Sequence, residues 1–365
     1  MKVKCIINKL NNFISKIEKI TGKNLNLPIL SCILLEAKDN KLFLKSTNLD
    51  LGVEIFINAE IEEEGTIAIP GSVLKNLISN ISGNNISLKT EKDNLLVSSE
   101  SNTSVIKSFP NDDFPMIPKI DLKDKILIDC KKLLKGFKSV WYSASTSTVR
   151  PELSSIFISI KDNYLYFVAT DSFRLAEFKI PVKTDKELKN ILIPYKNIPE
   201  IIRVFEDVDG DIEMSFTKNQ ISFKYDNIYL TSRIIDGNFP DYQQLIPKEH
   251  TTEVVVLLDD LINIFKIINI FSNKFNQVSF NIDPGNKVFE MNSKNDEVGE
   301  NVNKVAAALS GEALSINFNY RYIIDSFQSI HTDSLVLQFN GQSKPLVIRG
   351  VSDNQFLYLV MPMNK

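Results

Sequence analysis

The stretch Leu42-Phe43-Leu44-Lys45-Ser46-Thr47-Asn48 has two counterparts further along the chain. They are Leu165-Tyr166-Phe167-Val168-Ala169-Thr170-Asp171 and Val288-Phe289-Glu290-Met291-Asn292-Ser293-Lys294. Their hydroxyl residues Thr47, Thr170 and Ser293 follow one another at steps of 123 residues. A period of this length is the size of a domain, not of a solenoid repeat.

Two further landmarks recur with nearly the same period. Helix-like apolar pairs occur at Leu10/Ile14, Leu133/Phe137 and Leu261/Phe265, and second helical segments begin after Ile69, Ile193 and Phe318. Each copy therefore runs strand, helix, strands, helix, strands, which predicts an α+β domain with an antiparallel sheet and two helices on one face. We expect three tandem copies of one fold, with bounds at 1–122, 125–247 and 249–365.

Composition indicates a globular protein. The 365 residues are 43% hydrophobic and 24% charged, with 13 Gly and 14 Pro, unlike disordered or collagen-like chains. The longest apolar runs are about the length of Val254–Leu258, far short of the roughly 18 residues of a membrane span. No hydrophobic leader follows Met1, and Cys5, Cys32 and Cys130 cannot all pair, so we expect a reduced cytoplasmic protein with no membrane partner.

The formal net charge of −3 hides an uneven distribution. The six predicted helical windows are 9–21, 71–82, 131–142, 195–206, 259–271 and 319–330. Together they hold twelve basic and six acidic side chains, a net of +6, which leaves −9 for the rest of the chain. A single lysine on such a helix face is as readily a solvated residue as a contact, but the sum over six windows predicts a basic surface.

The sequence offers no catalytic constellation. The two histidines, His250 and His331, lack the spacing to cysteine or carboxylate that a metal site or a catalytic triad needs. No glycine-rich phosphate loop is present. A metal-dependent nuclease would require clustered carboxylates or histidines, so we expect a non-enzymatic protein with no cofactor and no metal.

Five sequence blocks resemble the beta sliding clamps of bacterial DNA polymerase III, over the whole length and in family order. They are Asn26-Leu27-Pro28-Ile29-Leu30, Ala169-Thr170-Asp171-Ser172-Phe173-Arg174-Leu175, Asp236-Gly237-Asn238-Phe239-Pro240-Asp241-Tyr242, Phe318-Asn319 with Tyr322, and Tyr358-Leu359-Val360-Met361-Pro362-Met363. The resemblance implies a head-to-tail homodimeric ring, with helices inside around duplex DNA and antiparallel sheets outside. It also implies a processivity factor that a clamp loader places on DNA.

A clamp that slides needs non-specific contacts from lysine or arginine to phosphate, without base readout. The candidate DNA-facing residues are Lys9, Lys16, Lys23, Lys75, Lys132, Lys135, Lys196, Arg203 and Lys266. Positions where the family often has arginine or aromatic residues are occupied here by Asn24, Pro151 and Glu152, which leaves the individual contacts open.

By resemblance, partner proteins dock a short linear peptide in an apolar cleft between the second and third domains. The implied partners are the polymerase catalytic subunit, the clamp loader, repair polymerases, mismatch-repair proteins and ligase. The matching cleft residues are Leu153, Thr170, Phe173, Arg174, Leu175, Pro240, Leu245, Asn319, Tyr322, Val360, Met361, Pro362 and Met363. The alternative is that these are core residues. Gln244 and the tail Asn364-Lys365 depart from the family, so peptide preference can differ.

Ring closure would join the first domain of one copy to the third domain of the other. The resemblance places Ile270 and Phe271 against a strand near Ser104 and Ile106, although a large apolar pair at a helix end also suits internal packing. A protein-only scaffold built from repeats is the alternative function, and in that case the lysines on the helix faces would be incidental.

Overall fold

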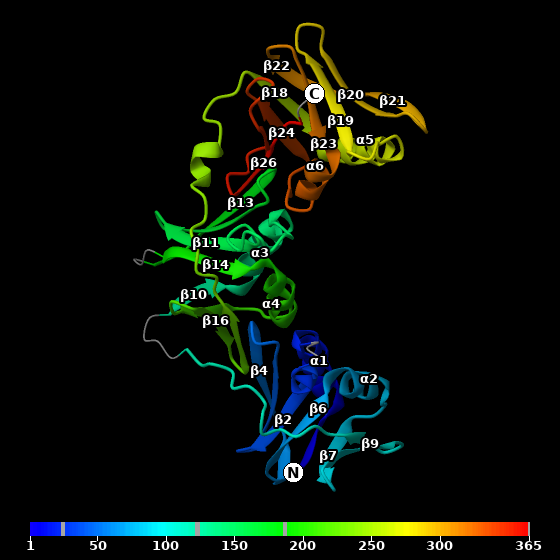
Figure 1. The fold of residues 1–365 in the computed structure, drawn as a ribbon, viewed down its shortest axis with the longest axis vertical. Helices are drawn as coiled ribbons and strands as arrows, with labels where there is room; N and C mark the ends of the chain where they lie inside the picture. Colours follow the sequence, from blue (N-terminus) through cyan, green and yellow to red (C-terminus); the bar gives the residue numbers. More distant parts are fainter. Residues whose placement is uncertain (23–25, 121–124, 185–187, 364–365) are drawn as a thin grey trace. The chain divides into compact units, whose positions relative to one another are not determined.

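The computed structural model describes residues 1–22, 26–120, 125–184 and 188–363. Within these ranges it has six α-helices: α1 (Ile7–Ile17), α2 (Gly71–Asn80), α3 (Cys130–Val140), α4 (Ile198–Phe205), α5 (Leu258–Ile270) and α6 (Tyr320–Phe327) (Figure 1). Each helix overlaps one predicted window. The threefold order of strands and helices is therefore confirmed at the level of elements.

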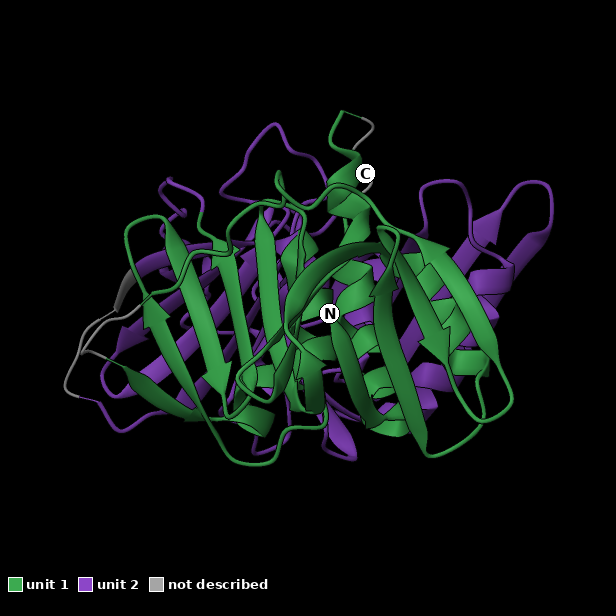
Figure 2. Ribbon diagram, turned by 90° about the horizontal axis from the view of Figure 1, so that it is seen from below, with its two compact units in different colours: residues 1–134, 196–234 green, residues 135–195, 235–365 purple. Residues whose placement is uncertain are grey.

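The chain packs as two compact units, coloured separately in Figure 2. Unit 1 comprises Met1–Leu134 and Lys196–Ile234, and unit 2 comprises Lys135–Tyr195 and Ile235–Lys365. The predicted central domain, 125–247, contributes to both units, so packing does not follow the predicted sequence bounds. Those bounds stay a prediction.

Unit 1 contains two antiparallel sheets. The five-stranded sheet has the order β5 (Glu60–Glu63), β1 (Lys2–Ile6), β7 (Asn85–Glu91), β8 (Asn94–Ser98), β9 (Thr103–Lys107). The eight-stranded sheet has the order β10 (Ile126–Asp129), β15 (Asp211–Phe216), β16 (Gln220–Tyr225), β17 (Ile228–Arg233), β4 (Leu51–Asn58), β3 (Lys41–Thr47), β2 (Cys32–Lys38), β6 (Gly65–Pro70). Strands β17 and β4 join two repeats, with Ile228 opposite Ile55 and Ser232 opposite Leu51.

Unit 2 is built in the same way. Its nine-stranded sheet has the order β14 (Leu188–Pro194), β11 (Ser155–Lys161), β12 (Tyr164–Thr170), β13 (Arg174–Pro181), β26 (Phe356–Val360), β25 (Leu346–Gly350), β24 (Ser334–Phe339), β18 (Thr252–Leu257), β22 (Ala307–Gly311). Its four-stranded sheet has the order β21 (Gly299–Lys304), β20 (Val288–Asn295), β19 (Gln277–Asp283), β23 (Leu314–Asn319). Here β13 pairs with β26, and Arg174 lies opposite Val360.

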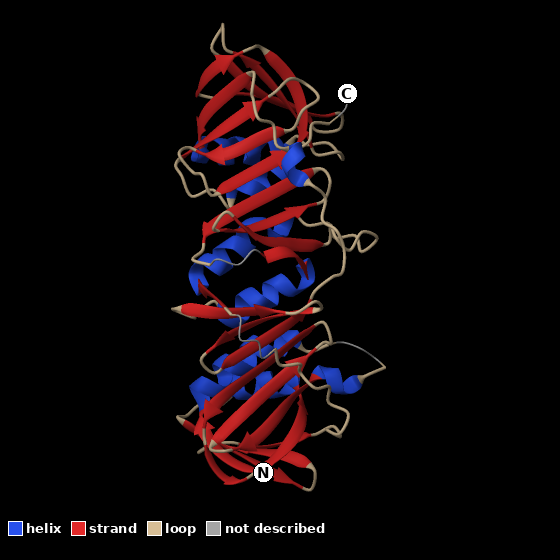
Figure 3. Ribbon diagram, turned by 90° about the vertical axis from the view of Figure 1, so that its left-hand side faces the viewer, coloured by secondary structure: helices blue, strands red, loops and turns tan. Residues whose placement is uncertain are grey.

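The helices are amphipathic, and the apolar residues that recur every three or four positions are the buried ones. In α1 the side chains of Leu10, Ile14 and Ile17 are fully buried, while Lys9 is exposed. Helix α1 contacts α2, α4, β3 and β4, all of unit 1. Figure 3 shows the helices of each unit gathered behind its strands. The arrangement that the 3.6-residue periodicity predicts, with sheets on one side and helices on the other, is therefore present in each unit.

Candidate functional site

A cavity of about 250 Å³ opens on unit 2 beside the C-terminal strand β26. Its lining comes from the turn before β13 and the start of β13, the linker before β18, the hairpin between β24 and β25, and the end of β26 with the residue that follows. The lining residues are Thr170, Ser172, Arg174, Leu175, Gln244, Leu245, Ser343, Lys344, Pro345, Leu359 and Met361. All of them belong to one compact unit. We call this cavity the β26 cleft.

The structure brings together five of the predicted cleft residues in this lining, namely Thr170, Arg174, Leu175, Leu245 and Met361. Pro240 instead lines a separate cavity of about 360 Å³. Seven others are not part of the lining: Leu153, Phe173, Asn319, Tyr322, Val360, Pro362 and Met363. Leu153 and Val360 are buried. Burial alone does not separate core from cleft residues, since Leu175 and Leu359 are equally buried and line the cleft.

The turn before β13 is held by its own side chains. The Thr170 hydroxyl donates to the Arg174 carbonyl oxygen at 2.7 Å and accepts from the Ser172 amide at 3.1 Å. An Asp171 carboxylate oxygen accepts from the backbone amides of Phe173 and Arg174 at 2.9 and 3.0 Å. Ser172 sits at φ 79°, the left-handed region that non-glycine residues seldom occupy. The turn is therefore a fixed wall of the cleft.

The Arg174 guanidinium is fully engaged within unit 2. Its Nε donates to Asp171 at 2.9 Å, one terminal nitrogen pairs with Asp325 of α6, and the other donates to the Tyr142 carbonyl oxygen at 2.7 Å. The guanidinium also lies 4.7 Å from the ring centre of Tyr322, a cation–π distance. Arg174 thus ties the turn to α6 and is a positioning residue of the cleft.

Backbone hydrogen bonds attach the segment after β26 to the turn before β13 and to β23. The Met361 amide donates to the Phe173 carbonyl oxygen at 2.8 Å, and the Met363 amide donates to that of Asn317 at 2.8 Å. The side chain of Asn319 caps α6 by accepting from the Arg321 amide. The side chain of Phe173 is 60% exposed, and Phe173 is not one of the lining residues.

Sequence reasoning missed the hairpin residues Ser343, Lys344 and Pro345, and also Ser172 and Leu359, as parts of the lining. The hairpin lies between two strands of the third repeat, and nothing local in Gln342-Ser343-Lys344 signals a site. Only the pairing of β25 with β26 brings it to the cleft.

The predicted DNA-facing residues divide by exposure. Lys9, Lys132, Lys196 and Lys266 are exposed, whereas Lys75, Lys135 and Arg203 are half-buried. Arg203 pairs with Glu200, and the Lys135 ammonium lies 5.4 Å from the ring centre of Phe178. Lys23 lies outside the described residues.

Lys16 requires a correction. Its side chain is only 6% exposed, its ammonium pairs with Asp207 at 3.1 Å and donates to the Val204 carbonyl oxygen at 3.2 Å. Both partners lie at the end of α4 or just after it. Because a buried, paired ammonium has no free face for phosphate, Lys16 fastens α1 to α4 within unit 1 and is not a DNA contact.

The predicted dimer residues differ in their exposure. Ile270, at the end of α5, is 61% exposed, and Phe271 is half-buried. In β9, Ser104 is half-buried, Ile106 is buried and Val105 is 64% exposed. Successive strand residues face opposite sides, so Ile106 points into its own unit. The side chain that β9 offers outward is Val105, which corrects the prediction for Ile106.

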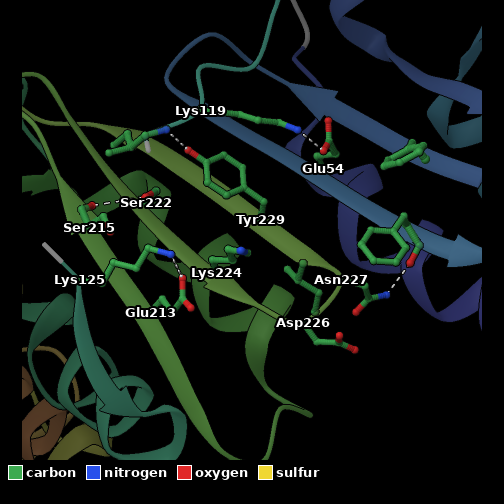
Figure 4. A pocket seen from close by; sticks show the side chains of 14 residues that line it. Glu54, Lys119, Lys125, Glu213, Ser215, Ser222, Lys224, Asp226, Asn227 and Tyr229 are labelled. Atoms are coloured by element: carbon green, nitrogen blue, oxygen red, sulfur yellow. Dashed lines mark hydrogen bonds and ion pairs between the residues drawn. The ribbon is translucent and has the colours of Figure 1, made fainter. Parts of the chain in front are cut away.

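A second cavity, of about 480 Å³, lies on the eight-stranded sheet of unit 1 (Figure 4). Lys119 pairs with Glu54 and Lys125 with Glu213, each at 2.7 Å. The Tyr229 hydroxyl accepts from the Ile120 amide at 2.8 Å and donates to the Pro118 carbonyl oxygen at 3.0 Å. These contacts attach the linker after the first repeat to the sheet. We therefore assign this cavity a structural role, the packing of the linker.

The described residues hold no metal-binding group of three or more His, Cys, Asp or Glu. His250 pairs with Glu253 at 3.3 Å. Burial raises the pKa of Cys5 to about 12 and that of Cys130 to about 11, so these thiols are protonated near neutral pH. Among the helices that the structure describes, none is long and apolar enough to cross a membrane.

Comparison with known proteins places all three repeats in one family. The DNA polymerase III beta subunit matches through its N-terminal domain at residues 1–118, its central domain at 127–241 and its C-terminal domain at 243–364. The beta sliding clamp of Staphylococcus epidermidis is 29% identical over 369 residues, covering 98% of this chain and 96% of that protein. The beta sliding clamp of Staphylococcus aureus is 27% identical over 367 residues, with the same coverage.

Solved structures agree with this assignment. The beta subunit of DNA polymerase III from Thermotoga maritima has a TM-score of 0.95 and 28% identity, and the match covers 100% of this chain and 99% of that one. The sliding clamp of Bacillus subtilis has a TM-score of 0.95 at 24% identity with the same coverage, which supports the fold. With matches to all three domains in order along almost the whole chain, this protein belongs to the DNA polymerase III beta subunit family of sliding clamps.

Proposed function

We propose that this chain closes as a head-to-tail homodimer around duplex DNA and keeps other DNA-processing proteins attached to it. The sliding-clamp function itself follows from membership of the family: the chain is a non-catalytic processivity subunit in DNA replication. The observation that carries it is the ordered match of three clamp domains. Domain bounds of 1–122, 125–247 and 249–365 and a cytoplasmic location are part of the proposal.

We propose that the DNA-facing surface consists of exposed lysines that lie on the helices or in the turn directly before a helix. Lys9, Lys132, Lys196 and Lys266 are exposed and lie on or beside four different helices. Contacts from such side chains go to phosphate, so they carry no sequence information and weaken as salt rises. A ring with this lining would hold DNA by closure and slide along it.

Ring closure is proposed to use the free edges of two strands. Strand β9 is the last strand of the five-stranded sheet, and β21 is the last strand of the four-stranded sheet. The exposed valines Val105 and Val302 lie on them, and Ile270 lies at the end of α5. Unpaired strand edges readily pair with another chain. Joining β9 of one copy to β21 of the other would satisfy both edges and cover these apolar side chains.

The β26 cleft is proposed as the docking site for short linear peptides of partner proteins. Its floor is apolar, its turn wall is fixed, and it adjoins the Met361-Pro362-Met363 tail, whose flexible thioethers suit several ligands. The expected partners are the polymerase catalytic subunit, the clamp loader, repair polymerases, mismatch-repair proteins and ligase.

The test is retention on DNA of different topology. The protein is loaded onto a nicked circular plasmid with a bacterial clamp loader and ATP, and the loaded complex is separated from free protein by gel filtration. Linearising the plasmid with a restriction enzyme should release the protein, because a closed ring leaves only over an end. Retention that is unchanged after cutting would refute encirclement and favour the repeat scaffold.

A further inference from the structure

We propose that the cavity of about 360 Å³ lined by Pro240 is a binding site for a mononucleotide, that is, a planar base joined through a sugar to a phosphate. We call it the β11 cavity. Strands β11, β12 and β14 form one side of it, and the linker before β18 forms the other. It lies wholly in unit 2 and shares no lining residue with the β26 cleft. The inference is therefore independent of the proposed peptide docking.

Aromatic rings form one wall of the β11 cavity. Phe157 of β11 and Phe239 of the linker are stacked, with ring centres 4.8 Å apart and ring planes inclined by 17°. The Tyr242 ring stands edge-on to both of them at 6.2 Å. Tyr166 of β12 is half-buried in the same lining. Because the sheet and the neighbouring rings hold this wall in place, it can receive a planar ring without rearrangement.

A β-bulge shapes another part of the lining. Ile158 lies opposite Ile191, but Ile160 lies opposite Leu188, so β14 carries one residue more than β11 along this stretch. Within the bulge Asn190 has φ 50° and is exposed. Bulges redirect side chains and are common beside binding sites. The bulge thus brings Asn190 to the cavity, where it joins the lining.

The volume indicates a ligand larger than a single ring. A cavity of about 150 Å³ holds a benzene molecule, and small-molecule pockets begin at roughly 300 Å³. The β11 cavity, at about 360 Å³, has room for a ring and a second group of similar size. Ser159, Asn190 and Gln243 supply a hydroxyl and two amides to its lining. These groups can bond sugar hydroxyls and base nitrogens.

The charges of the lining favour an anion with an amino-bearing ring. Lys161 is exposed, and within the described part of the chain its ammonium has no ion pair or hydrogen bond. Asp241 is the one carboxylate of the lining, and it accepts from the Gln244 amide at 2.7 Å. The Lys161 charge is therefore available to a phosphate, and Asp241 can also accept from the amino group of a base. Ring, hydroxyls and anion together describe a mononucleotide.

The experiment titrates the full-length protein with AMP at low salt and measures binding by isothermal titration calorimetry. Two fragments of AMP separate the contributions: adenosine lacks the phosphate, and ribose 5-phosphate lacks the base. We expect AMP to bind with a dissociation constant of roughly 10 µM to 1 mM. Adenosine should bind roughly 2- to 5-fold more weakly, the contribution of an exposed ion pair, and ribose 5-phosphate should show no binding.

Variants locate the binding. Lys161→Met should lower the affinity for AMP to that for adenosine and leave the affinity for adenosine unchanged. Ser159→Tyr places a ring in the cavity and should abolish binding of both. The matched control is Lys183→Met, an exposed lysine of unit 2 outside this lining, which should bind AMP as the wild type does. Circular dichroism checks that each variant is folded. In roughly 0.5 M NaCl the advantage of AMP over adenosine should shrink, because salt screens an exposed pair.

Several results would overturn the inference. They are equal affinity for AMP and adenosine, no binding of AMP, or unchanged AMP affinity in both Lys161→Met and Ser159→Tyr. A Gly-Trp-Gly peptide that bound more tightly than AMP, and lost binding in Ser159→Tyr, would assign the cavity to a protein side chain. Tighter binding of a short oligodeoxyadenylate than of AMP would assign it to a DNA strand. Retention on circular DNA and peptide docking are measured separately and would stand after any of these failures.

Discussion

Gly136 shows how one residue of a helix can be fixed by a side chain far away in the sequence. A Cβ built at Gly136 in α3 would lie 2.4 Å from the ring of Phe167, which is fully buried in the same unit. Atoms this close cannot coexist, and the ring is enclosed by the core. The glycine is therefore required by packing, although it is a poor helix former.

We predict that Gly136→Ala lowers the free energy of unfolding by about 1–3 kcal/mol, as overpacked cores do. This loss should outweigh the gain of up to about 1 kcal/mol in helix propensity. Urea unfolding followed by circular dichroism measures the change. The control is Lys138→Ala, an exposed position of the same helix, for which less than about 0.5 kcal/mol is expected. Equal stability of Gly136→Ala and wild type would contradict the steric role assigned to Phe167.

Lys9 and Lys16 lie on the same helix but have different roles. We predict that Lys9→Met reduces the slope of log affinity against log salt for a duplex by about 0.9, the value for one lost phosphate contact. Lys16→Met should leave that slope unchanged and instead destabilise the protein, because the ion pair with Asp207 is lost. Anisotropy titrations at several salt concentrations, with urea unfolding of both variants, check the difference. A smaller salt slope in Lys16→Met, with the slope of Lys9→Met unchanged, would show that Lys16 faces DNA.

At the scale of elements, the turn between β3 and β4 and the turn between β12 and β13 have the same hydrogen bonds. Thr47 bonds to the Leu51 carbonyl oxygen at 2.9 Å and to the Leu49 amide at 3.1 Å, as Thr170 does to Arg174 and Ser172. Both threonines are about 5% exposed, and both turns contain a residue with positive φ, Leu49 at 77° and Ser172 at 79°. The repeat thus extends to individual hydrogen bonds.

This duplication supplies a matched pair of variants. We predict that Thr170→Val and Thr47→Val each lower the free energy of unfolding by about 1–2 kcal/mol. Each substitution removes a hydroxyl and leaves the backbone carbonyl oxygen and amide that it bonded without that partner. Only Thr170→Val should weaken binding of a cleft peptide, because only the turn before β13 lines the cleft. Stability is measured by urea unfolding and affinity by anisotropy. Equal loss of peptide affinity in both variants would point to general loosening and against a wall made by the Thr170 turn.

For the whole molecule, assembly should depend on the exposed end of α5. We predict that Ile270→Asp combined with Phe271→Asp yields folded monomers, because charges would be buried at the proposed contact with β9 of a second copy. Analytical ultracentrifugation measures the mass and circular dichroism the fold. The control is Ile267→Asp, a residue of α5 that is 39% exposed, which should still dimerise. Dimers that persist in the double variant would place the interface elsewhere.

Most of the fold could be predicted from sequence because its signals are local and repeated. Apolar spacing of three to four residues located all six helices, and alternation located strands such as β16 and β24. The site was predicted less completely. The block around Thr170 and the terminal Met361 were found through the family resemblance, whereas Lys344 carries no local signal. Lys16 and Ile106 were misassigned because periodicity shows which face a residue takes, but not what meets that face.

The sequence by itself determined the threefold repeat, the element order and the contrast between basic helices and acidic remainder. These properties depend on residues close together in the chain, so spacing and composition express them directly. Tertiary structure alone decided that β13 pairs with β26 and β17 with β4, that Asp207 neutralises Lys16, and that a hairpin lysine joins the cleft. Each of these depends on groups distant in sequence, whose meeting is fixed by sheet register and core packing rather than by any local pattern.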